Sequence, residues 1–506
     1  MGKLENKIGD LLKSSAVVFV GLVFGKALGL LGEALIVRSL PPETYGSLAL
    51  AYTITLLCGR IGNFGLQDGV TRLMSAETER SDKLRILQHG FVLAVFSGVL
   101  LGAGLLMTRE LIATFVDDSL VSSYLVVFAP LVLLLIVRGI VFNALRAEER
   151  SLAAVLSRDI FGRLIPFAFL GSALYLGMPT NAAIGYWIGL PLLITVSALF
   201  FLRDQYPVSD IVTFRPRKEI LGRLGRFSLP LAMSTYIFTF LSYFDILMIG
   251  YFLESSQVGF YRAIQPLQQI STLLMTAFTF LFLPTATQYY EEGDISGLGS
   301  FYSVSTKWLI IGTLPIVLVF SLFAEDVVRT LFGVAYLPAA PALAVLVAGQ
   351  SFRAMVGLDG DIVKAMDRTE IELGSALAGL VVNVALNLYL IPRYGITGAA
   401  FATVVGYVVY NVVEVAIIYR LLGIHPFAFN NFKPAVVTVV FAVGVRYVTR
   451  GNEYSLLALC GIGALFGLVA LISTVGTKSL DSTDRELLDR VAERTGIDLE
   501  PVQRFM

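Results

Sequence analysis

Residues 21–72 read GLVFGKALGLLGEALIVRSLPPETYGSLALAYTITLLCGRIGNFGLQDGVTR, and this stretch decides the fold. Two apolar runs flank a short polar turn at residues 38–46, and each run is about long enough to cross a hydrocarbon core of roughly 30 Å. Charged residues nevertheless lie within the runs, Lys26 and Glu33 in the first and Arg60 in the second. Because a charge at mid-bilayer costs about 2.5–3.5 kcal/mol, the hairpin predicts a path for a polar solute.

The apolar pattern of this hairpin recurs along the whole chain. The 506 residues are 56% hydrophobic and only 15% charged, with a mean hydropathy of +0.77. Backbone groups in lipid must be bonded within their own segment, so such spans are helices. We therefore expect an all-α polytopic membrane protein with about fourteen spans, placed near 14–37, 45–64, 88–107, 122–143, 155–177, 182–202, 227–252, 257–284, 304–324, 338–357, 371–391, 396–420, 432–449 and 454–475.

Short similarities between the two halves predict an internal repeat. Tyr45-Gly46 is echoed by Gly259-Phe260-Tyr261 at an offset near 213, and residues 179–185 resemble 396–402 at an offset near 217. Six spans per repeat is an even number, so both halves enter the membrane from the same side, as in a parallel repeat. The predicted parts are an interfacial helix at 1–13, six-helix bundles at 14–202 and 227–420 joined by a cytoplasmic linker at 203–226, two additional helices at 432–475 and a cytoplasmic amphipathic tail at 476–506.

The distribution of basic residues predicts the orientation. With the N-terminus inside, inner loops and tails hold about 27 of the 38 Lys and Arg residues, whereas outer loops hold about six. Both termini are therefore expected in the cytoplasm. The 38 acidic residues balance the 38 basic ones, which argues against a general nucleic-acid binder.

Catalytic and metal chemistry have little support in the sequence. The two cysteines, Cys58 and Cys460, lie in apolar spans, and the two histidines, His89 and His425, lack a partner at ligand spacing. Residues 21–27 superficially resemble a phosphate loop but have one residue too few between the glycines and no following Ser or Thr. We expect a transporter rather than an enzyme, with no metal and no cofactor.

Polar stripes on particular helices supply candidate substrate-binding residues. Lys26 and Glu33 are seven residues apart and so share one helical face, and the eighth span carries a stripe of polar side chains beginning at Arg262. The candidates for substrate binding are Lys26, Arg60, Arg262, Gln265 and Gln269. The alternative is that such polar groups only hold membrane helices together.

The acids Glu33 and Asp245 are candidates for coupling or gating, because a carboxylate at that depth readily exchanges a proton or pairs with a cation. The alternative for both is a static ion pair. Other charged residues are expected near the inner surface, where long side chains reach water or form gate pairs; they are Arg138, Arg163, Arg353 and Glu414. Asn383 and Asn387 are expected to bond neighbouring helices, and the Gly21-Gly25-Gly29 run to allow close helix packing.

The chain resembles the Wzx-type oligosaccharide flippases, a polysaccharide transporter family of the multidrug/oligosaccharidyl-lipid/polysaccharide (MOP) exporter superfamily. The resemblance extends over nearly the whole chain and rests on the turn at 38–46, on 64–72, on 245–250 with 258–261, and most specifically on Asn387-Leu-Tyr-Leu-Ile-Pro-Arg-Tyr-Gly-Ile-Thr-Gly-Ala-Ala-Phe-Ala-Thr403.

The resemblance implies that the protein moves a polyprenyl-phosphate- or polyprenyl-diphosphate-linked oligosaccharide from the cytoplasmic to the outer leaflet by alternating access. It also implies a multi-pass protein of the cell membrane, a monomer, with glycan-assembly enzymes as possible partners. Alternatives are a flippase for a peptidoglycan-precursor lipid, a cation-coupled multidrug exporter on the same fold, and a non-transporting scaffold in a glycan-assembly complex. The balance of Glu33 and Asp245 by Lys26 and Arg262 argues against a site for cationic drugs.

Overall fold

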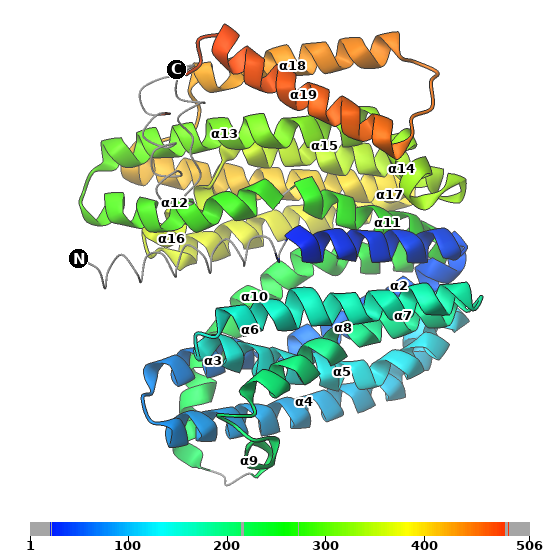
Figure 1. The fold of residues 1–506 in the computed structure, drawn as a ribbon, viewed down its shortest axis with the longest axis vertical. Helices are drawn as coiled ribbons and strands as arrows, with labels where there is room; N and C mark the ends of the chain where they lie inside the picture. The colour runs from blue at the N-terminus through cyan, green and yellow to red at the C-terminus, as the bar shows by residue number, and fades with distance from the viewer. Residues whose placement is uncertain (1–20, 22, 214–216, 272, 481–483, 485–506) are drawn as a thin grey trace. The chain divides into compact units, whose positions relative to one another are not determined.

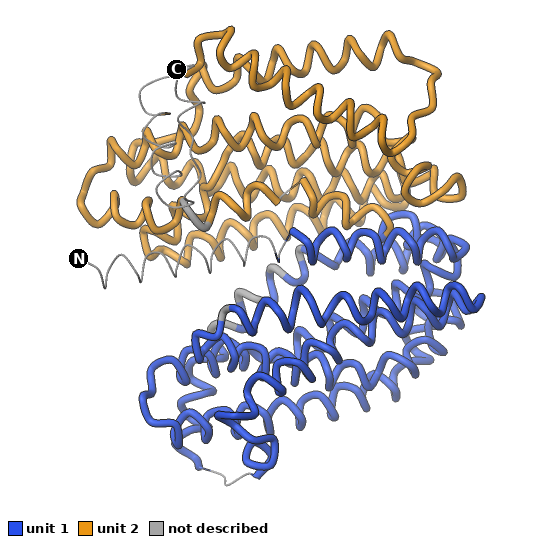
Figure 2. The backbone as a smooth tube through the Cα atoms, in the orientation of Figure 1, with its two compact units in different colours: residues 1–262 blue, residues 263–506 orange. Residues whose placement is uncertain are grey.

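A computed structural model describes residues 21, 23–213, 217–271, 273–480 and 484, and every element within them is a helix (Figure 1). The predicted interfacial helix at 1–13 and most of the predicted tail at 476–506 lie outside these residues. The described chain divides into two compact units, residues 1–262 and 263–506 (Figure 2).

Unit 1 begins with a helix over residues 23–39. It continues with α2 (Pro42–Gly62), α3 (Leu66–Ala76), α4 (Arg80–Phe115), α5 (Ser119–Ala147), α6 (Ser151–Val155), the π-helix η1 (Leu156–Phe161), α7 (Gly162–Tyr175), α8 (Pro179–Leu202), α9 (Val208–Val212), α10 (Lys218–Phe252) and the first turns of α11 (Ser255–Ser271).

Unit 2 contains the remainder of α11 and the helices that follow it. These are α12 (Leu273–Glu291), α13 (Ile295–Leu322), α14 (Ala324–Phe332), the 3-10 helix η2 (Val334–Ala339), α15 (Ala340–Val356), α16 (Asp359–Ala365), α17 (Thr369–Leu422), α18 (Phe429–Val448) and α19 (Leu456–Gly476).

Long apolar helices confirm a membrane protein with many spans. Among the described residues eight helical segments are long and apolar enough to cross a membrane, or nine if a bent helix pair between Ser255 and Glu291 is counted as one span. The 54-residue α17 covers two expected spans, because Gly395 breaks it with φ 59° and ψ −143°. The full number of fourteen spans and the parallel repeat stay predictions.

Two glycines of the similar turns noted in the sequence meet within unit 1. A Cβ on Gly46 of α2 would collide with the carbonyl oxygen of Ser255, and a Cβ on Gly259 of α11 would collide with the carbonyl oxygen of Pro42. The similar Tyr-Gly turns identified in the sequence therefore lie against each other. Only the absence of a side chain allows two backbones to approach so closely.

Asp118 holds three helices of unit 1 together at this contact. Its carboxylate accepts the backbone N–H of Leu120 at 2.9 Å and so caps α5. The same carboxylate accepts the hydroxyl of Ser47 at 2.5 Å and the hydroxyl of Ser255. We call this group, Asp118 with Ser47 and Ser255, the Asp118 clasp.

Unit 2 has its own core and its own buried ion pair. Phe282 of α12 stacks on Phe301 of α13 with ring centroids 5.0 Å apart. The Lys307 ammonium, fully buried on α13, donates to Asp484 at 2.5 Å and to the Ser479 carbonyl at 2.7 Å. This contact joins Ser479 and Asp484, which follow α19, to α13. Removing either member of the ion pair would leave an uncompensated buried charge.

We predict that Gly46→Ala lowers the thermal unfolding midpoint of the detergent-purified protein. An added methyl group must push against backbone, and overpacking of this kind costs about 1–3 kcal/mol. Gly104→Ala on α4 is the matched control, because a Cβ there meets nothing within 4 Å. The control should leave the midpoint unchanged or raise it, since glycine within a helix costs about 0.5–1 kcal/mol relative to alanine. Equal midpoints for the two variants would contradict the close contact.

Candidate functional site

Glu33 is the central acid of unit 1, and two aromatic donors hold it. It lies on the helix over 23–39 and is 6% exposed. One carboxylate oxygen accepts the Tyr45 hydroxyl at 2.5 Å, and the other accepts the Trp187 indole N–H at 3.2 Å. Two hydrogen bonds to a buried carboxyl group fix its orientation.

Aromatic packing fixes the donors around Glu33. The rings of Tyr52 and Trp187 stack with centroids 4.6 Å apart and an interplanar angle of 17°, and Phe128 of α5 packs against both. The helices α2, α5 and α8 therefore meet at one aromatic cluster. An indole N–H inside an apolar span requires a partner, and this is a signal in the sequence that could have pointed to Trp187.

Arg262 is a cation that interacts with Glu33. Its guanidinium interacts electrostatically with Glu33, and the phenols of Tyr45, Tyr52 and Tyr243 lie around it. The pair explains how a membrane helix tolerates either charge, because each one lowers the cost of burying the other.

A second group of cations continues from this pair. Arg138 of α5 interacts electrostatically with Tyr52 and with Arg60, the exposed cation near the end of α2. On the other side Tyr186 of α8 interacts with both Glu33 and Arg163. The sequence favoured snorkelling or gate contacts for Arg138 and Arg163, and the structure brings both into the surroundings of the candidate residues.

Lys26 lies beside Arg163 rather than beside an acid. The two cations interact electrostatically, and Lys26 is half-buried. The helix that carries Lys26 approaches α7 closely along its glycines, since a Cβ on Gly25 or Gly29 would lie against the Arg163 guanidinium. The expectation that this glycine run serves helix packing is confirmed.

Unit 1 contains five cations that lie within expected spans and near one another or near Glu33. They are Lys26, Arg60, Arg138, Arg163 and Arg262. Arg262 has Glu33 as its largest electrostatic interaction. A second acid, Asp159, binds Arg158 at 2.9 Å and lies with Arg163 against Gly25, so in the described chain the contacts of this group show more cations than acids. Such an arrangement attracts an anion.

Asp245 on α10 repeats the arrangement at Glu33. It is 4% exposed, and its carboxylate accepts the Tyr261 hydroxyl at 2.6 Å and the backbone N–H of Ile246 at 2.9 Å. Tyr45 and Tyr261 are the tyrosines of the two similar turns. Each turn thus supplies the phenol that holds the acid on the preceding helix.

The other predicted residues lie elsewhere. Gln265, half-buried, and Gln269, exposed, continue along α11 beyond Arg262 and belong to unit 2. Asn387 donates to Asn383 at 3.1 Å, and Asn383 donates to Thr403 across the break of α17 at 3.4 Å. The structural role expected for the two asparagines is confirmed. That Lys26 and Arg262 face one cavity stays a prediction.

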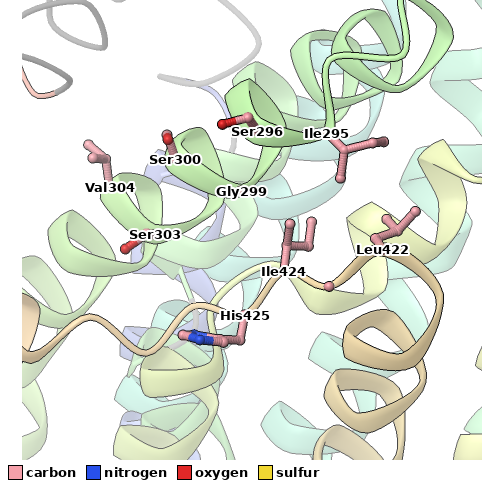
Figure 3. Close-up of a pocket in the computed structure, with 10 residues that line it drawn as sticks. Ile295, Ser296, Gly299, Ser300, Ser303, Val304, Leu422, Ile424 and His425 are labelled. Atoms are coloured by element: carbon pink, nitrogen blue, oxygen red, sulfur yellow. The ribbon is translucent and has the colours of Figure 1, made fainter.

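A pocket of about 590 Å³ in unit 2 contains none of the candidate residues (Figure 3). Ser296, Ser300 and Ser303 of α13 line one side, and Ile424 and His425 of the α17–α18 connection line the other. The N-terminus of α13 is already capped by its own Asp294, which accepts the Gly297 N–H at 2.8 Å. None of the residues that line the pocket is a lysine or an arginine, so the pocket lacks the cationic side chains found in unit 1.

A family described as "Polysaccharide biosynthesis protein" matches residues 11–290, more than half of the chain. The chain belongs to this family. The matched residues include all of unit 1 from residue 11 onward, with both tyrosine-held acids and the five in-span cations.

Archaeal relatives of this family member are named as flippases. The chain is 22% identical over 467 residues to the "Probable low-salt glycan biosynthesis flippase Agl15" of Haloferax volcanii, covering 91% of this chain and 94% of that one. It is 26% identical over 215 residues to the "Probable flippase AglR" of the same organism, with 42% of each chain covered. It spans half the length of a Methanocaldococcus jannaschii membrane protein, MJ1068, at 24% identity.

Solved structures of membrane transporters share this fold. The fold is similar to that of the lipid II flippase MurJ in an inward closed conformation, with a TM-score of 0.73 and 13% identity over 90% of this chain and 98% of that one. An inward-facing multidrug resistance transporter of the MATE family gives 0.65 and 15% over 86% and 100%.

We predict that Glu33→Ala destabilises unit 1 strongly, by about 3–5 kcal/mol, because it leaves Arg262 without its acid and leaves two buried donors unpaired. The thermal unfolding midpoint of the purified protein measures the effect. Glu33→Gln should cost less, since an amide retains part of the hydrogen bonding to Tyr45 and Trp187. The exposed Glu291 provides the control, and Glu291→Gln should leave the midpoint unchanged. A Glu33→Ala protein with the same unfolding midpoint as this control would show that Glu33 does not stabilise the fold.

Proposed function

We propose that this member of the polysaccharide biosynthesis family is a flippase for a lipid-linked glycan. It moves a polyprenyl-phosphate- or polyprenyl-diphosphate-linked oligosaccharide from the cytoplasmic to the outer leaflet, for cell-surface polysaccharide or glycan biosynthesis. The observation that carries the proposal is the excess of cations inside the spans of unit 1, in a family whose relatives are named glycan flippases. Its role is transport of the lipid across the bilayer rather than chemical conversion.

The phosphate is bound by Lys26, Arg60 and Arg262, because guanidinium and ammonium groups form strong charge-assisted hydrogen bonds with phosphate oxygens. We add Arg138 and Arg163 to these three. Arg138 interacts electrostatically with Arg60, and Arg163 interacts with Lys26. Tyr186 interacts with both Arg163 and Glu33. The amides of Gln265 and Gln269 serve the sugar hydroxyls. The prenyl tail stays in the lipid, which spares the protein an apolar tunnel.

The architecture that fits this function has fourteen spans in two six-helix bundles, 14–202 and 227–420, related as a parallel repeat, with two additional helices at 432–475. The meeting of Gly46 with Gly259 supports the repeat, because these glycines align in the two similar turns and each lies against the backbone of the other turn.

Alternating access then requires the Asp118 clasp to open. In the present conformation its carboxylate joins α2, α5 and α11 at the end of unit 1 predicted to face outward. Parting Ser47 and Ser255 from Asp118 exchanges two protein hydrogen bonds for bonds with water, a change of modest net cost. The clasp is therefore suited to a gate that opens reversibly.

Glu33 and Asp245 stay the acids predicted to take part in coupling or gating. Their hydrogen bonds to Tyr45 and Tyr261 hold both carboxyl groups in place in this conformation and support a static role as the simpler one. Transport by Asp245→Asn measured across pH decides the matter, since an unchanged profile at normal expression removes Asp245 from coupling.

The protein is a multi-pass membrane protein. We place it in the cell membrane as a monomer with both termini in the cytoplasm, where glycan-assembly enzymes are its partners. Labelling from outside intact cells of a cysteine introduced at position 217 or 218 would contradict this orientation. The MurJ and MATE structures share the fold at 13–15% identity and carry no argument for a peptidoglycan precursor or a drug as the substrate.

We predict that Lys26→Ala and Arg262→Ala each lower the rate of translocation about 10- to 100-fold. Charge-assisted hydrogen bonds contribute about 1.5–3 kcal/mol each, and each 1.4 kcal/mol is tenfold in rate. The assay is flipping of a fluorescent polyprenyl-diphosphate-linked disaccharide in proteoliposomes. Lys26→Arg should retain part of the rate, since charge matters more than shape for a mobile phosphate.

Arg109→Ala is the control, because Arg109 lies at the end of α4 and pairs with Glu110 at 3.2 Å outside the candidate site. Its rate should equal that of the wild type. Wild-type rates for Lys26→Ala and Arg262→Ala at equal incorporation would refute the phosphate-binding role.

A further inference from the structure

Two buried carboxyl groups of unit 2 are not used by the substrate path. Glu414 of α17 is fully buried and Asp359, the first residue of α16, is 4% exposed. One oxygen of Asp359 lacks a hydrogen-bond partner within the described chain, and the carboxyl group of Glu414 has no donor there other than the Tyr410 phenol. The two residues are neighbours, since a Cβ on Gly360 would lie 3.6 Å from the Glu414 carboxylate.

Two cations near the pair, Arg353 and Lys364, make close contacts with other side chains. Arg353 of α15 has its guanidinium 4.8 Å from the ring centre of Tyr407. The Lys364 ammonium lies 3.6 Å from Asp361 and 3.5 Å from Glu372. Neither cation therefore forms a close ion pair with Glu414.

Every titratable group facing the pair from the packed helices can be named. Tyr302 of α13, Arg353 of α15, and Asp361 and Lys364 of α16 interact electrostatically with one or both carboxyl groups, as do groups of α17 itself. Those of α17 are Glu372 and Tyr410. From α12 the buried members of the core that contains Ile362 are Phe282 and Ala286, and the titratable residues packed against that core are Tyr289 and Tyr290.

This environment differs from that of the other buried acids. Glu33 and Asp245 each accept two hydrogen bonds, which stabilise the carboxylate. Asp326 of α14, also in unit 2, accepts the backbone N–H of Tyr454 at 3.1 Å. Two adjacent carboxylates in an apolar site cannot both stay ionised without partners, because burial and mutual repulsion both disfavour the second charge.

We propose that Glu414 and Asp359 form a carboxyl–carboxylate pair that binds one exchangeable proton inside unit 2. The proton is shared between an oxygen of Glu414 and the unpartnered oxygen of Asp359, so that the buried pair carries one negative charge instead of two. The phenol of Tyr410, one turn before Glu414, donates a hydrogen bond to Glu414 and interacts electrostatically with Asp359.

Asp359 lies on α16, outside the candidate membrane spans, and its acid strength agrees with this assignment. Burial raises the pKa of the Asp359 carboxyl to about 7, against the opposing effects of the Gly360 N–H and the Arg353 guanidinium. Because this pKa is higher in the folded than in the unfolded state, stability present at acid pH is lost as the pH rises through about 7.

A proton bound in unit 2 gives the flippase a means of coupling, and this part rests on the proposed function. Glu414 lies two turns before the end of α17, and Asp359 begins the short α16 that follows α15. A movement that admits water to the pair allows the second carboxyl group to ionise and releases the proton. The proton-binding site itself can be tested without any transport measurement.

The test is pH-difference infrared spectroscopy on the full-length purified protein. The carbonyl stretch of a protonated carboxylic acid should persist to neutral pH in the wild type and disappear on mild alkalinisation. In Glu414→Gln and in Asp359→Asn the titration midpoint should move to lower pH, since one partner's charge is gone. The double variant should lose the band.

Asp326→Asn and Asp245→Asn are the controls, and both should leave the band unchanged. An unchanged band in the double variant would overturn the proposal, as would equal losses in the controls. If Glu414→Gln fails to elute as folded protein, Glu414→Asp keeps the charge and should shift the midpoint. The thermal unfolding midpoint provides a second reading: its fall with rising pH should be smaller in Asp359→Asn than in the wild type, and an identical fall would also count against the pair.

Discussion

Positive charge inside an apolar helix bundle is the constraint on which the rest of unit 1 depends. Five cations lie within its spans, and Glu33 is the acid that two aromatic donors fix beside Arg262. A charge of this kind is tolerated only when it is paired, hydrated or awaiting a charged ligand. The aromatic cluster of Tyr52, Phe128 and Trp187 meets this need. The indole N–H of Trp187 donates to Glu33, and its ring packs against the other two in the core.

Aromatic side chains donate hydrogen bonds to several buried carboxyl groups of this chain. Both tryptophans of the chain donate their indole N–H to a buried carboxylate, Trp187 to Glu33 at 3.2 Å and Trp308 to Asp484 at 2.9 Å. Tyr45 and Tyr261 hold Glu33 and Asp245 in the same manner. Glu414 and Asp359 stand out because the two carboxyl groups are neighbours and Asp359 keeps one oxygen without a hydrogen-bond partner in the described chain.

Much of the fold follows from hydropathy alone, because lipid allows only helices. The break at Gly395 falls between two predicted spans, and the second span ends close to Phe64 and Gly65, whose positive φ values stop the helix. The close approach at Gly46 was visible only as a repeated turn, since a sequence shows the glycine but not the backbone opposite it.

The site was predicted less completely. Lys26, Glu33 and Arg262 were identified from the cost of buried charge, whereas Arg138 and Arg163 were assigned to the inner surface from their position along the helix. Helical periodicity gives the face of a side chain but not the neighbour across the bundle. Asp359 and Glu414 are 55 residues apart in the chain and meet only through the packing of α16 on α17.

The central claim is that unit 1 recognises the phosphate of a lipid carrier, and a direct binding measurement tests it. Native mass spectrometry of the purified protein with a polyprenyl phosphate and with the uncharged polyprenol of equal chain length compares the two ligands in one experiment. The account predicts tighter binding of the phosphate, by about tenfold or more for a charge-assisted contact of about 1.5–3 kcal/mol, and competition by inorganic diphosphate. Equal binding of the phosphate and the alcohol would contradict it.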